Sequence, residues 1–284
     1  MKKHIAGIIP IAGLISNFNL PWHPSLMPIA PNYLAVERAV AECAYAGCNT
    51  IWIVCDDNVI PLVRYQVGEK IQDPVYNYRH FEHNKSEFKK PIRIYYVPIA
   101  IRDINKRDNL AWSAIFGAKT ANNIIRKISK WLVPSKFYIA WPYAWYNPSE
   151  VRQYRREILE TEFAFQFENQ SVKDNLYLGF TLNMQQIDDL LSEVREKSTG
   201  IWKDPETRQE RLALDERFSY RNFDLKKTFE SISFEKYTFA SIEEYFSISC
   251  WKEYCRYLKN KDDVLKPRFL KYSEWNEIGV DEEI

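Results

Sequence analysis

Short, continuously apolar segments recur along the first part of the chain. They span His4 to Ile11, Thr50 to Cys55, Ile92 to Val97 and Lys136 to Trp141. These segments are rich in β-branched and aromatic residues, which favours strands. Strands that are apolar on both faces are typical of parallel sheets covered by helices, so we expect these four segments to be parallel neighbours in one sheet.

Helical periodicity fills the intervals between these segments. Apolar residues from Tyr33 to Ala46 recur at helical spacing, and Gly47 stands where such a helix would end. Further helical patterns run from Asn109 to Lys130 and from Glu150 to Gln166. The alternation of strand and helix through residue 166 predicts an α/β fold with a doubly wound, mostly parallel sheet of the Rossmann-like type.

The chain beyond residue 166 carries a weaker pattern. Leu176 to Leu182 predicts a strand, and Met184 to Glu196 predicts a helix. A length of 284 residues lies at the upper end of what one α/β domain uses. We therefore expect a single domain over 1–284, with the sheet core in 1–166 and C-terminal helical additions that complete the fold in 167–284.

Composition and charge narrow the class of protein. The chain is 46% hydrophobic and 27% charged, with a formal net charge of +1, which is ordinary for a globular cytosolic protein. A net charge this close to zero creates no strong positive potential that could hold a polyanion, so we expect neither nucleic acid nor a membrane as a partner. No run of 18 apolar residues occurs, and the apolar amino end reads as a buried strand rather than a secretion signal. The expected location is the cytoplasm.

The residue types that bind metals occur in settings that favour other roles. Five cysteines form no C-x-x-C pair, and we expect them to be reduced core residues. His80 and His83 form an H-x-x-H within the charged stretch from Tyr78 to Lys90, which is typical of a solvated loop. The sequence therefore predicts no metal site.

The connection after the first predicted strand is the leading candidate for a ligand site. It runs from Ala12 to Pro31, and its prolines exclude regular structure over most of its length. Long irregular connections inside a compact domain are usually functional or disordered. This one leaves the carboxyl end of a strand, where open α/β sheets place their ligands.

Residues around this connection resemble the amino-terminal signature of one enzyme family. The matching residues are Gly7-Ile8-Ile9-Pro10-Ile11-Ala12-Gly13-Leu14, Leu20-Pro21, Pro24, Met27-Pro28-Ile29, Ala46-Gly47 and Ile51-Trp52-Ile53-Val54. Their order is similar to that in bacterial UTP glucose-1-phosphate uridylyltransferases and the wider sugar-1-phosphate nucleotidyltransferase family. The resemblance implies a GT-A type sheet, transfer of a nucleotidyl group from an NTP to a sugar-1-phosphate, and use of Mg²⁺.

Residues that the chemistry of this family needs are replaced. The family's G-T-R is matched by Ile15-Ser16-Asn17, and its P-K by Pro24-Ser25, so both cations expected to hold the phosphates are absent. Each lost charge-assisted hydrogen bond is worth about 1.5 to 3 kcal/mol. The counterpart of the metal-binding G-D-D is Pro142-Tyr143-Ala144, although Mg²⁺ prefers carboxylate oxygens.

The candidate ligand-binding residues follow the ends of the predicted strands. In the first connection they are Ala12, Gly13, Leu14, Ser16, Asn17, His23 and Ser25. Asp56 and Asp57 end the second strand, where they can bind a ribose or a metal, or cap the next helix. Asn109 belongs to the counterpart of the family's G-L segment.

Aromatic residues take the place of the missing charge after the fourth strand. Trp141, Tyr143 and Trp145 alternate, which would put all three on one face of a strand. They form either a partly exposed surface for stacking or protein contact, or a filling of core space that the missing ligands would have occupied.

The resemblance and its departures leave two main functions open, and a third is a glycosyltransferase on the same sheet, although the sequence has no D-x-D triplet to hold its metal. The favoured interpretation is a non-catalytic relative, without catalytic residues or cofactor, that binds a nucleotide, a sugar or sugar phosphate, or a protein partner. The alternative is an active nucleotidyltransferase that makes a nucleotide sugar with unusual active-site residues and Mg²⁺. The amino-acid sequence does not decide between them.

Overall fold

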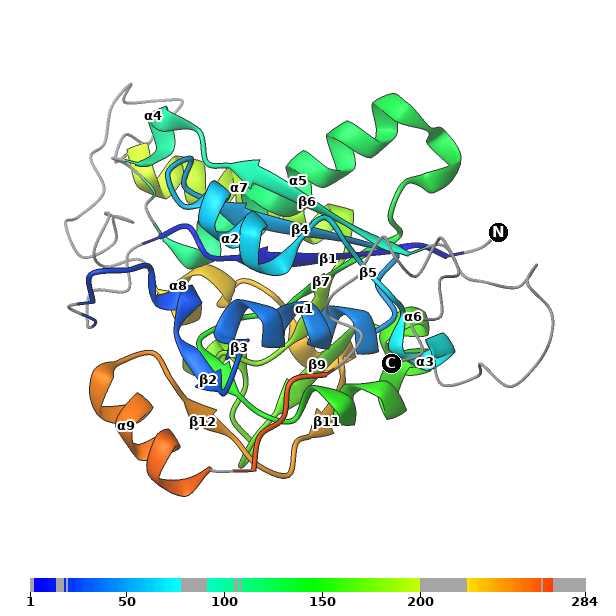
Figure 1. Cartoon of the computed structure of the whole chain (residues 1–284). Coiled ribbons are helices and arrows are strands. Elements are labelled where there is room, and N and C mark those ends of the chain that lie inside the picture. The colour runs from blue at the N-terminus through cyan, green and yellow to red at the C-terminus, as the bar shows by residue number, and fades with distance from the viewer. Residues whose placement is uncertain are drawn as a thin grey trace, which may run out of the picture.

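A computed structural model shows an eight-stranded sheet with helices on both faces (Figure 1). It describes residues 3–13, 18, 20–77, 91–104, 107, 109–199, 224–261 and 263–267. The H-x-x-H of His80 and His83 therefore lies outside the described residues, and so do Leu14, Ile15, Ser16 and Asn17. The strand order is β11-β9-β10-β7-β1-β4-β6-β5. The strands are β1 (Ile5–Pro10), β4 (Thr50–Cys55), β5 (Lys70–Ile71), β6 (Ile92–Pro98), β7 (Lys136–Ile139), β9 (Phe163–Gln166), β10 (Phe180–Leu182) and β11 (Thr238–Ser241).

The centre of the sheet has the parallel arrangement that the sequence predicts. β1 pairs in parallel with β4 and β7, and β6 pairs in parallel with β4. β10 runs antiparallel to β7 and β9, and β5 runs antiparallel to β6. The prediction of an α/β fold with a mostly parallel sheet is confirmed. The carboxyl ends of β1, β4, β6 and β7 consequently share one edge.

The remaining elements are helices and two small sheets. β2 (Pro28–Ala30) pairs with β3 (Tyr33–Leu34), and β8 (Ala144–Trp145) pairs with β12 (Phe246–Ser247). The 3₁₀ segments are η1 (Pro24–Leu26), η3 (Lys130–Leu132), η4 (Pro148–Tyr154), η5 (Val172–Asp174) and η6 (Phe234–Lys236). The α-helices are α1 (Ala35–Tyr45), α2 (Ile60–Val67), α3 (Pro74–Asn77), α4 (Ile101–Ile104), α5 (Leu110–Ile128), α6 (Arg155–Glu160), α7 (Met184–Thr199), α8 (Leu225–Phe229) and α9 (Trp251–Asn260). None of the helices among the described residues is long and apolar enough to span a membrane.

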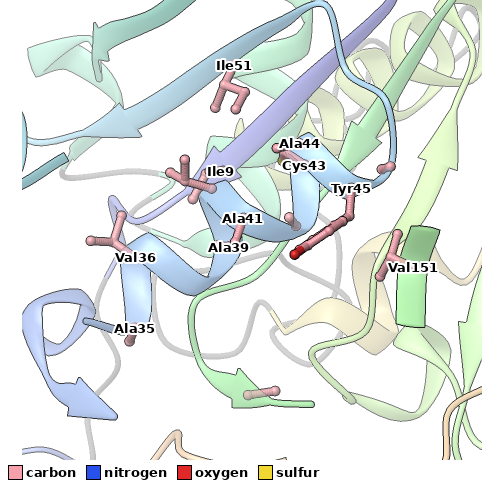
Figure 2. Packing of buried hydrophobic residues seen from close by; sticks show 14 of the residues in the cluster. Ile9, Ala35, Val36, Ala39, Ala41, Cys43, Ala44, Tyr45, Ile51 and Val151 are labelled. Atoms are coloured by element: carbon pink, nitrogen blue, oxygen red, sulfur yellow. The ribbon is translucent and has the colours of Figure 1, made fainter. Parts of the chain in front are cut away.

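α1 and α5 cover opposite faces of the central strands. Alternate residues of β1 point to opposite sides, so Ile9 packs with α1 and Ile8 packs with α5. Figure 2 shows Ile9 and Ile51 above α1, facing its side chains. β1, β4 and β7 are thus buried on both faces, which explains why their sequences are apolar without alternation. β6 differs, because its buried residues alternate with exposed ones such as Arg93 and Tyr95.

The predicted helix from Glu150 to Gln166 is wrong in its second half. The chain forms η4 and α6, and then Phe163–Gln166 becomes β9, which pairs with β10 and β11. A short apolar run fits a buried strand as well as a helix. The two partner strands lie beyond residue 166, and they decide the outcome.

The five cysteines are free thiols. The prediction of core residues is confirmed for Cys43, Cys48 and Cys55, which are buried. It is wrong for Cys250 and Cys255, which are partly exposed at the start and in the middle of α9.

One ion pair lies entirely inside the core. Arg38 and Glu42 stand one turn apart on α1, both completely buried, with 3.0 Å between Arg38 Nη2 and Glu42 Oε2. Arg38 Nη2 also donates to the carbonyl of Trp141, while the Tyr138 hydroxyl donates to Glu42 Oε1 at 2.7 Å. Burial raises the pKa of Glu42, and the charge of Arg38 opposes that rise. The pair therefore ties α1 to β7 and to the residues that follow it.

We expect Arg38→Met to lower the free energy of unfolding by about 3 to 5 kcal/mol, because it leaves Glu42 buried without its partner. Adding Glu42→Gln should recover part of this loss, since Gln keeps an acceptor for Tyr138 but carries no charge. The measurement is urea denaturation. Arg156→Met is the matched control, because Arg156 and Glu160 form the same i, i+4 pair with exposed side chains, and the expected cost is below about 1 kcal/mol. Equal losses in the two single variants would contradict the prediction.

Candidate functional site

The candidate site lies at the carboxyl edge of the parallel strands. The backbone N–H groups of Ile11 and Ala12 both donate to the carbonyl of Val54 at 2.9 Å, which fixes the end of β1 beside the end of β4. The carboxyl end of β7 lies on the other side of β1. The residues after these three strands are therefore brought to one place, as the order of the strands requires.

Gly13 joins this edge to the start of α5. Its φ is +123°, and a Cβ there would lie 2.7 Å from both the carbonyl carbon of Asn109 and the nitrogen of Leu110. Only glycine permits both this backbone conformation and this approach. The Ser113 hydroxyl donates to the carbonyl of Ala12 at 2.7 Å. Ala12, Gly13 and Asn109 are thus brought together.

Asn109 has a structural task at this junction. Its side-chain oxygen accepts a hydrogen bond from the N–H of Ala111 at 2.7 Å, so it is the N-cap of α5. The sequence pattern placed the helix start correctly. It did not single out Ser113, which anchors the same junction from inside the first turn, although a serine in an otherwise apolar helix start is a signal that can be read.

His23 and Ser25 face each other in the connection after β1. His23 Nδ1 and Ser25 Oγ are 2.8 Å apart, and the N–H of Ser25 donates to the same nitrogen at 3.3 Å. Burial lowers the pKa of His23 to about 4, and a hydrogen bond with the backbone of Ile11 opposes this shift. Ser25 is completely buried. A lysine at this enclosed position would place an ammonium group in the core.

Asp56 and Asp57 follow β4 without capping α2. The carbonyl of Asp56 accepts from the N–H groups of Val59 and Ile60, and no side chain caps the helix, so the capping interpretation is wrong. Burial, and then the charge of Asp57, raise the pKa of Asp56. Within the part of the chain that the structure describes, neither carboxylate has a hydrogen bond or an ion pair. Both remain available as acceptors.

Of the two interpretations of the aromatic residues, the partly exposed surface is wrong. Trp141 and Tyr143 are completely buried, and Trp145 is 7% exposed. Nor do the three share one face, because Trp141 and Tyr143 pack with the α5 side of the sheet and Trp145 packs with the α1 side. β7 ends at Ile139, so the two-residue period of a strand does not continue through them.

Elements from the carboxyl-terminal part of the chain cover these rings. Trp141 stacks on Phe180 of β10, with ring centres 6.4 Å apart, and its indole nitrogen donates to the carbonyl of Leu178. The ring of Trp145 lies 5.7 Å from that of Tyr257 in α9. The core-filling interpretation therefore accounts for these aromatic rings.

Tyr143 places a buried phenol where the resemblance would expect a carboxylate. Its hydroxyl donates to the carbonyl of Ile11 at 3.3 Å, which links the segment after β7 to the end of β1. Burial raises the pKa of this phenol well above its ordinary range. The neighbouring Ala144 offers no oxygen ligand from its side chain. The residues at the positions that the resemblance assigns to Mg²⁺ therefore do not fit that ion, and no group of three or more His, Cys, Asp or Glu among the described residues could hold a metal.

An ion pair lies at the rim of this edge, and the sequence pattern did not single it out. Asp103 is buried, and Arg107 Nη1 donates to its Oδ1 at 2.7 Å. Arg107 Nε donates to the hydroxyl of Ser198 at 2.7 Å, and the guanidinium lies 4.9 Å from the ring centre of Trp112. The i, i+4 spacing of Asp103 and Arg107 was the available signal. The pair holds the carboxyl end of α7 against the start of α5.

Solved structures of nucleotide-sugar enzymes share this fold. A putative glucose-1-phosphate thymidylyltransferase from Bacillus anthracis, in complex with a sucrose, matches with a TM-score of 0.53 and 11% identity, over 94% of this chain and 98% of that chain. UDP-glucose pyrophosphorylase complexed with UDP-glucose matches with a TM-score of 0.52 and 12% identity, over 91% and 100%. No protein-family model matches the sequence, and no curated protein sequence matches it. At such identities the likeness shows the fold alone, which is that of sugar-1-phosphate nucleotidyltransferases.

Gly13→Ala should destabilise the protein more than Gly68→Ala. Gly68 also has a positive φ, +81°, but a Cβ there meets nothing within 4 Å, so its substitution carries backbone strain of about 1 to 3 kcal/mol. Gly13→Ala adds overlap with the start of α5, which we expect to cost about 1 to 3 kcal/mol more. Urea denaturation of both variants measures the difference. Equal losses would show that the junction between Gly13 and α5 is not close-packed.

His23 should make stability fall in mild acid. Its pKa of about 4 lies below the ordinary value of 6.5, so between these pH values the unfolded chain binds a proton that the folded chain does not. Stability is fully present above pH 6.5 and falls by about 3 kcal/mol as the pH approaches 4. His23→Asn keeps an acceptor for the N–H of Ser25 but does not titrate. Unfolding free energies measured at pH 7 and at pH 4.5 should therefore change less in the variant, and identical changes would contradict the prediction.

Proposed function

We propose that this chain is a non-catalytic relative of the sugar-1-phosphate nucleotidyltransferases that binds a nucleotide sugar, or the sugar or nucleoside part of one, at the carboxyl edge of its sheet. The fold supports the class of ligand, because one structure that shares it is a complex with UDP-glucose. The replaced residues support the absence of nucleotidyl transfer. Cytoplasmic location remains part of this proposal.

The observation that carries the proposal is the position of Tyr143. Its completely buried ring and its hydrogen bond to Ile11 occupy the junction between the ends of β1 and β7. The resemblance assigns a metal-binding carboxylate to this place. Phosphoryl-type transfer depends on metal and cations that neutralise the charge developing on the phosphates. A phenol that donates to a backbone carbonyl supplies neither.

The basic side chains near this edge are also held in contacts with other protein groups. Arg38 is enclosed in its pair with Glu42, and Arg107 is held by Asp103 and Ser198. His23 is neutral at pH 7 because burial lowers its pKa to about 4. The described residues of the edge therefore offer little to hold a triphosphate.

Two carboxylates remain available at the same edge, and they suit another kind of contact. The side chains of Asp56 and Asp57 can accept hydrogen bonds from the hydroxyl groups of a ribose or a hexose. Their negative charge disfavours phosphate close to them. These properties support recognition of the sugar or nucleoside part of a ligand rather than of an NTP.

The alternative of an active nucleotidyltransferase would require Asp56 and Asp57 to recruit Mg²⁺ themselves. Two adjacent carboxylates at the end of one strand can bind a hydrated magnesium ion weakly. The described part of the chain does not bring a third carboxylate to them. This alternative predicts turnover with Mg²⁺ that is lost when both aspartates are replaced.

We expect no pyrophosphate release from UTP or dTTP with glucose-1-phosphate and Mg²⁺. Turnover within the usual enzymatic range of about 1 to 1,000 per second would contradict the non-catalytic proposal. UDP-glucose should instead raise the thermal unfolding midpoint by several degrees, because a ligand at about 100 times its Kd adds about 2.7 kcal/mol of stability.

Paired substitutions locate this binding. Asp56→Asn with Asp57→Asn should abolish the shift caused by UDP-glucose. Asp188→Asn with Asp189→Asn is the matched control, because it alters another adjacent aspartate pair, on α7, and should leave the shift unchanged. A shift that survives in the first variant would place the ligand elsewhere, and no shift with UDP-glucose, UMP or glucose-1-phosphate would refute ligand binding.

A further inference from the structure

The carboxyl end of α5 carries an exposed apolar patch. Its members are four large apolar side chains within nine residues, exposed by 39%, 74%, 80% and 50%: Ile124, Ile128, Trp131 and Leu132. Ile124 and Ile128 are neighbours on one side of the helix, and the other two belong to η3. Figure 1 shows this part of α5 standing out from the body of the molecule at the upper right. Exposed apolar groups gathered in this way mark an interaction surface.

Basic residues are interspersed with these apolar ones. Arg126, Lys127 and Lys130 are all exposed, and within the described residues none of them forms an ion pair. No aspartate or glutamate occurs in the chain between Asp108 and Glu150. On α7, which packs against α5, Asp188 pairs with Lys119. The patch is therefore both apolar and positive.

The patch lies at the opposite end of the sheet from the candidate site. α5 starts beside Gly13 and its 19 residues span about 28 Å. After η3, the N–H of Ser135 donates to the carbonyl of His4 at 2.8 Å, just before β1 begins. The helix extends beyond the end of the sheet here, so no strand covers the side chains of its last turn. A ligand at the carboxyl edge does not explain this surface.

We infer that the end of α5 and η3 dock the protein reversibly on an anionic lipid surface. Interfacial binding by helices combines apolar side chains, which enter the boundary between headgroups and acyl chains, with Lys and Arg, which contact anionic headgroups. Tryptophan is favoured at that depth. The net charge of +1 argued against a membrane partner for the chain as a whole, but the local charge is what a surface contacts.

The charge of the patch disfavours a second copy of the chain as its occupant. A two-fold contact through this surface would bring Arg126, Lys127 and Lys130 close to the same residues of the partner. Like charges in such a contact repel each other without compensation. An anionic bilayer complements both properties of the patch at once.

Vesicle flotation with the full chain tests the inference. Binding should be at least about tenfold stronger to vesicles of phosphatidylcholine mixed with phosphatidylserine than to phosphatidylcholine alone, and should weaken as NaCl is added. Lys127→Gln with Lys130→Gln should reduce the partition coefficient by about 25-fold, roughly fivefold for each charge. Ile128→Ser with Trp131→Ser should reduce it by about tenfold or more.

A matched control distinguishes binding through this surface from non-specific binding to vesicles. Trp251 and Leu258 on α9 are exposed by 56% and 45% beside basic residues, so Trp251→Ser with Leu258→Ser should leave vesicle binding unchanged. Unaltered urea denaturation would confirm that the variants fold. Equal binding to neutral and anionic vesicles, an equal loss in the control, or no binding would overturn the inference. So would a dimer, seen by light scattering, that Ile128→Ser with Trp131→Ser dissociates.

Discussion

The structure depends on an ion pair that is closed off from water. Arg38 and Glu42 are both completely buried on α1, and buried charges are costly unless they are paired and hydrogen-bonded. From the side of the sheet, the carbonyl of Trp141 accepts from Arg38 and the hydroxyl of Tyr138 donates to Glu42. Gly179 leaves room for it, since a Cβ there would lie 2.4 Å from Glu42 Oε1. These contacts tie α1 to β7 and to the segment that follows it.

This constraint extends to the carboxyl edge. The Trp141 carbonyl held by Arg38 opens the segment in which Tyr143 reaches across to Ile11. If this segment moved away from its hydrogen-bond partners, its polar groups would remain unsatisfied in the core. Among the described residues, the edge is therefore mostly apolar between β1 and β7, and the carboxylates of Asp56 and Asp57 at the end of β4 have no ion-pair partner. This arrangement supports the proposed recognition of hydroxyl groups rather than of phosphates.

Charged residues are distributed unevenly over a molecule whose net charge is close to zero. Asp56 and Asp57 lie at one end of the sheet, and the basic residues of α5 and η3 lie at the other. A net charge of +1 conceals both regions, because fields act over about one Debye length rather than over the whole chain. The proposed ligand binding at one end and the proposed docking at the other can therefore be tested separately.

The sequence by itself determined the elements whose signals are local. The four parallel strands, α1 and α5 were predictable because apolar periodicity and caps such as Asn109 act over a few residues. Of the candidate residues, Ala12, Gly13 and Asn109 meet as the strand order implied, whereas Leu14, Ser16 and Asn17 remain predictions. Tertiary structure alone decided that Phe163–Gln166 is a strand, that the aromatic rings are buried, and that Arg38 belongs to the core. These outcomes depend on partners far along the chain, such as β10, β11 and α9, and burial against a distant element leaves no local pattern in the sequence.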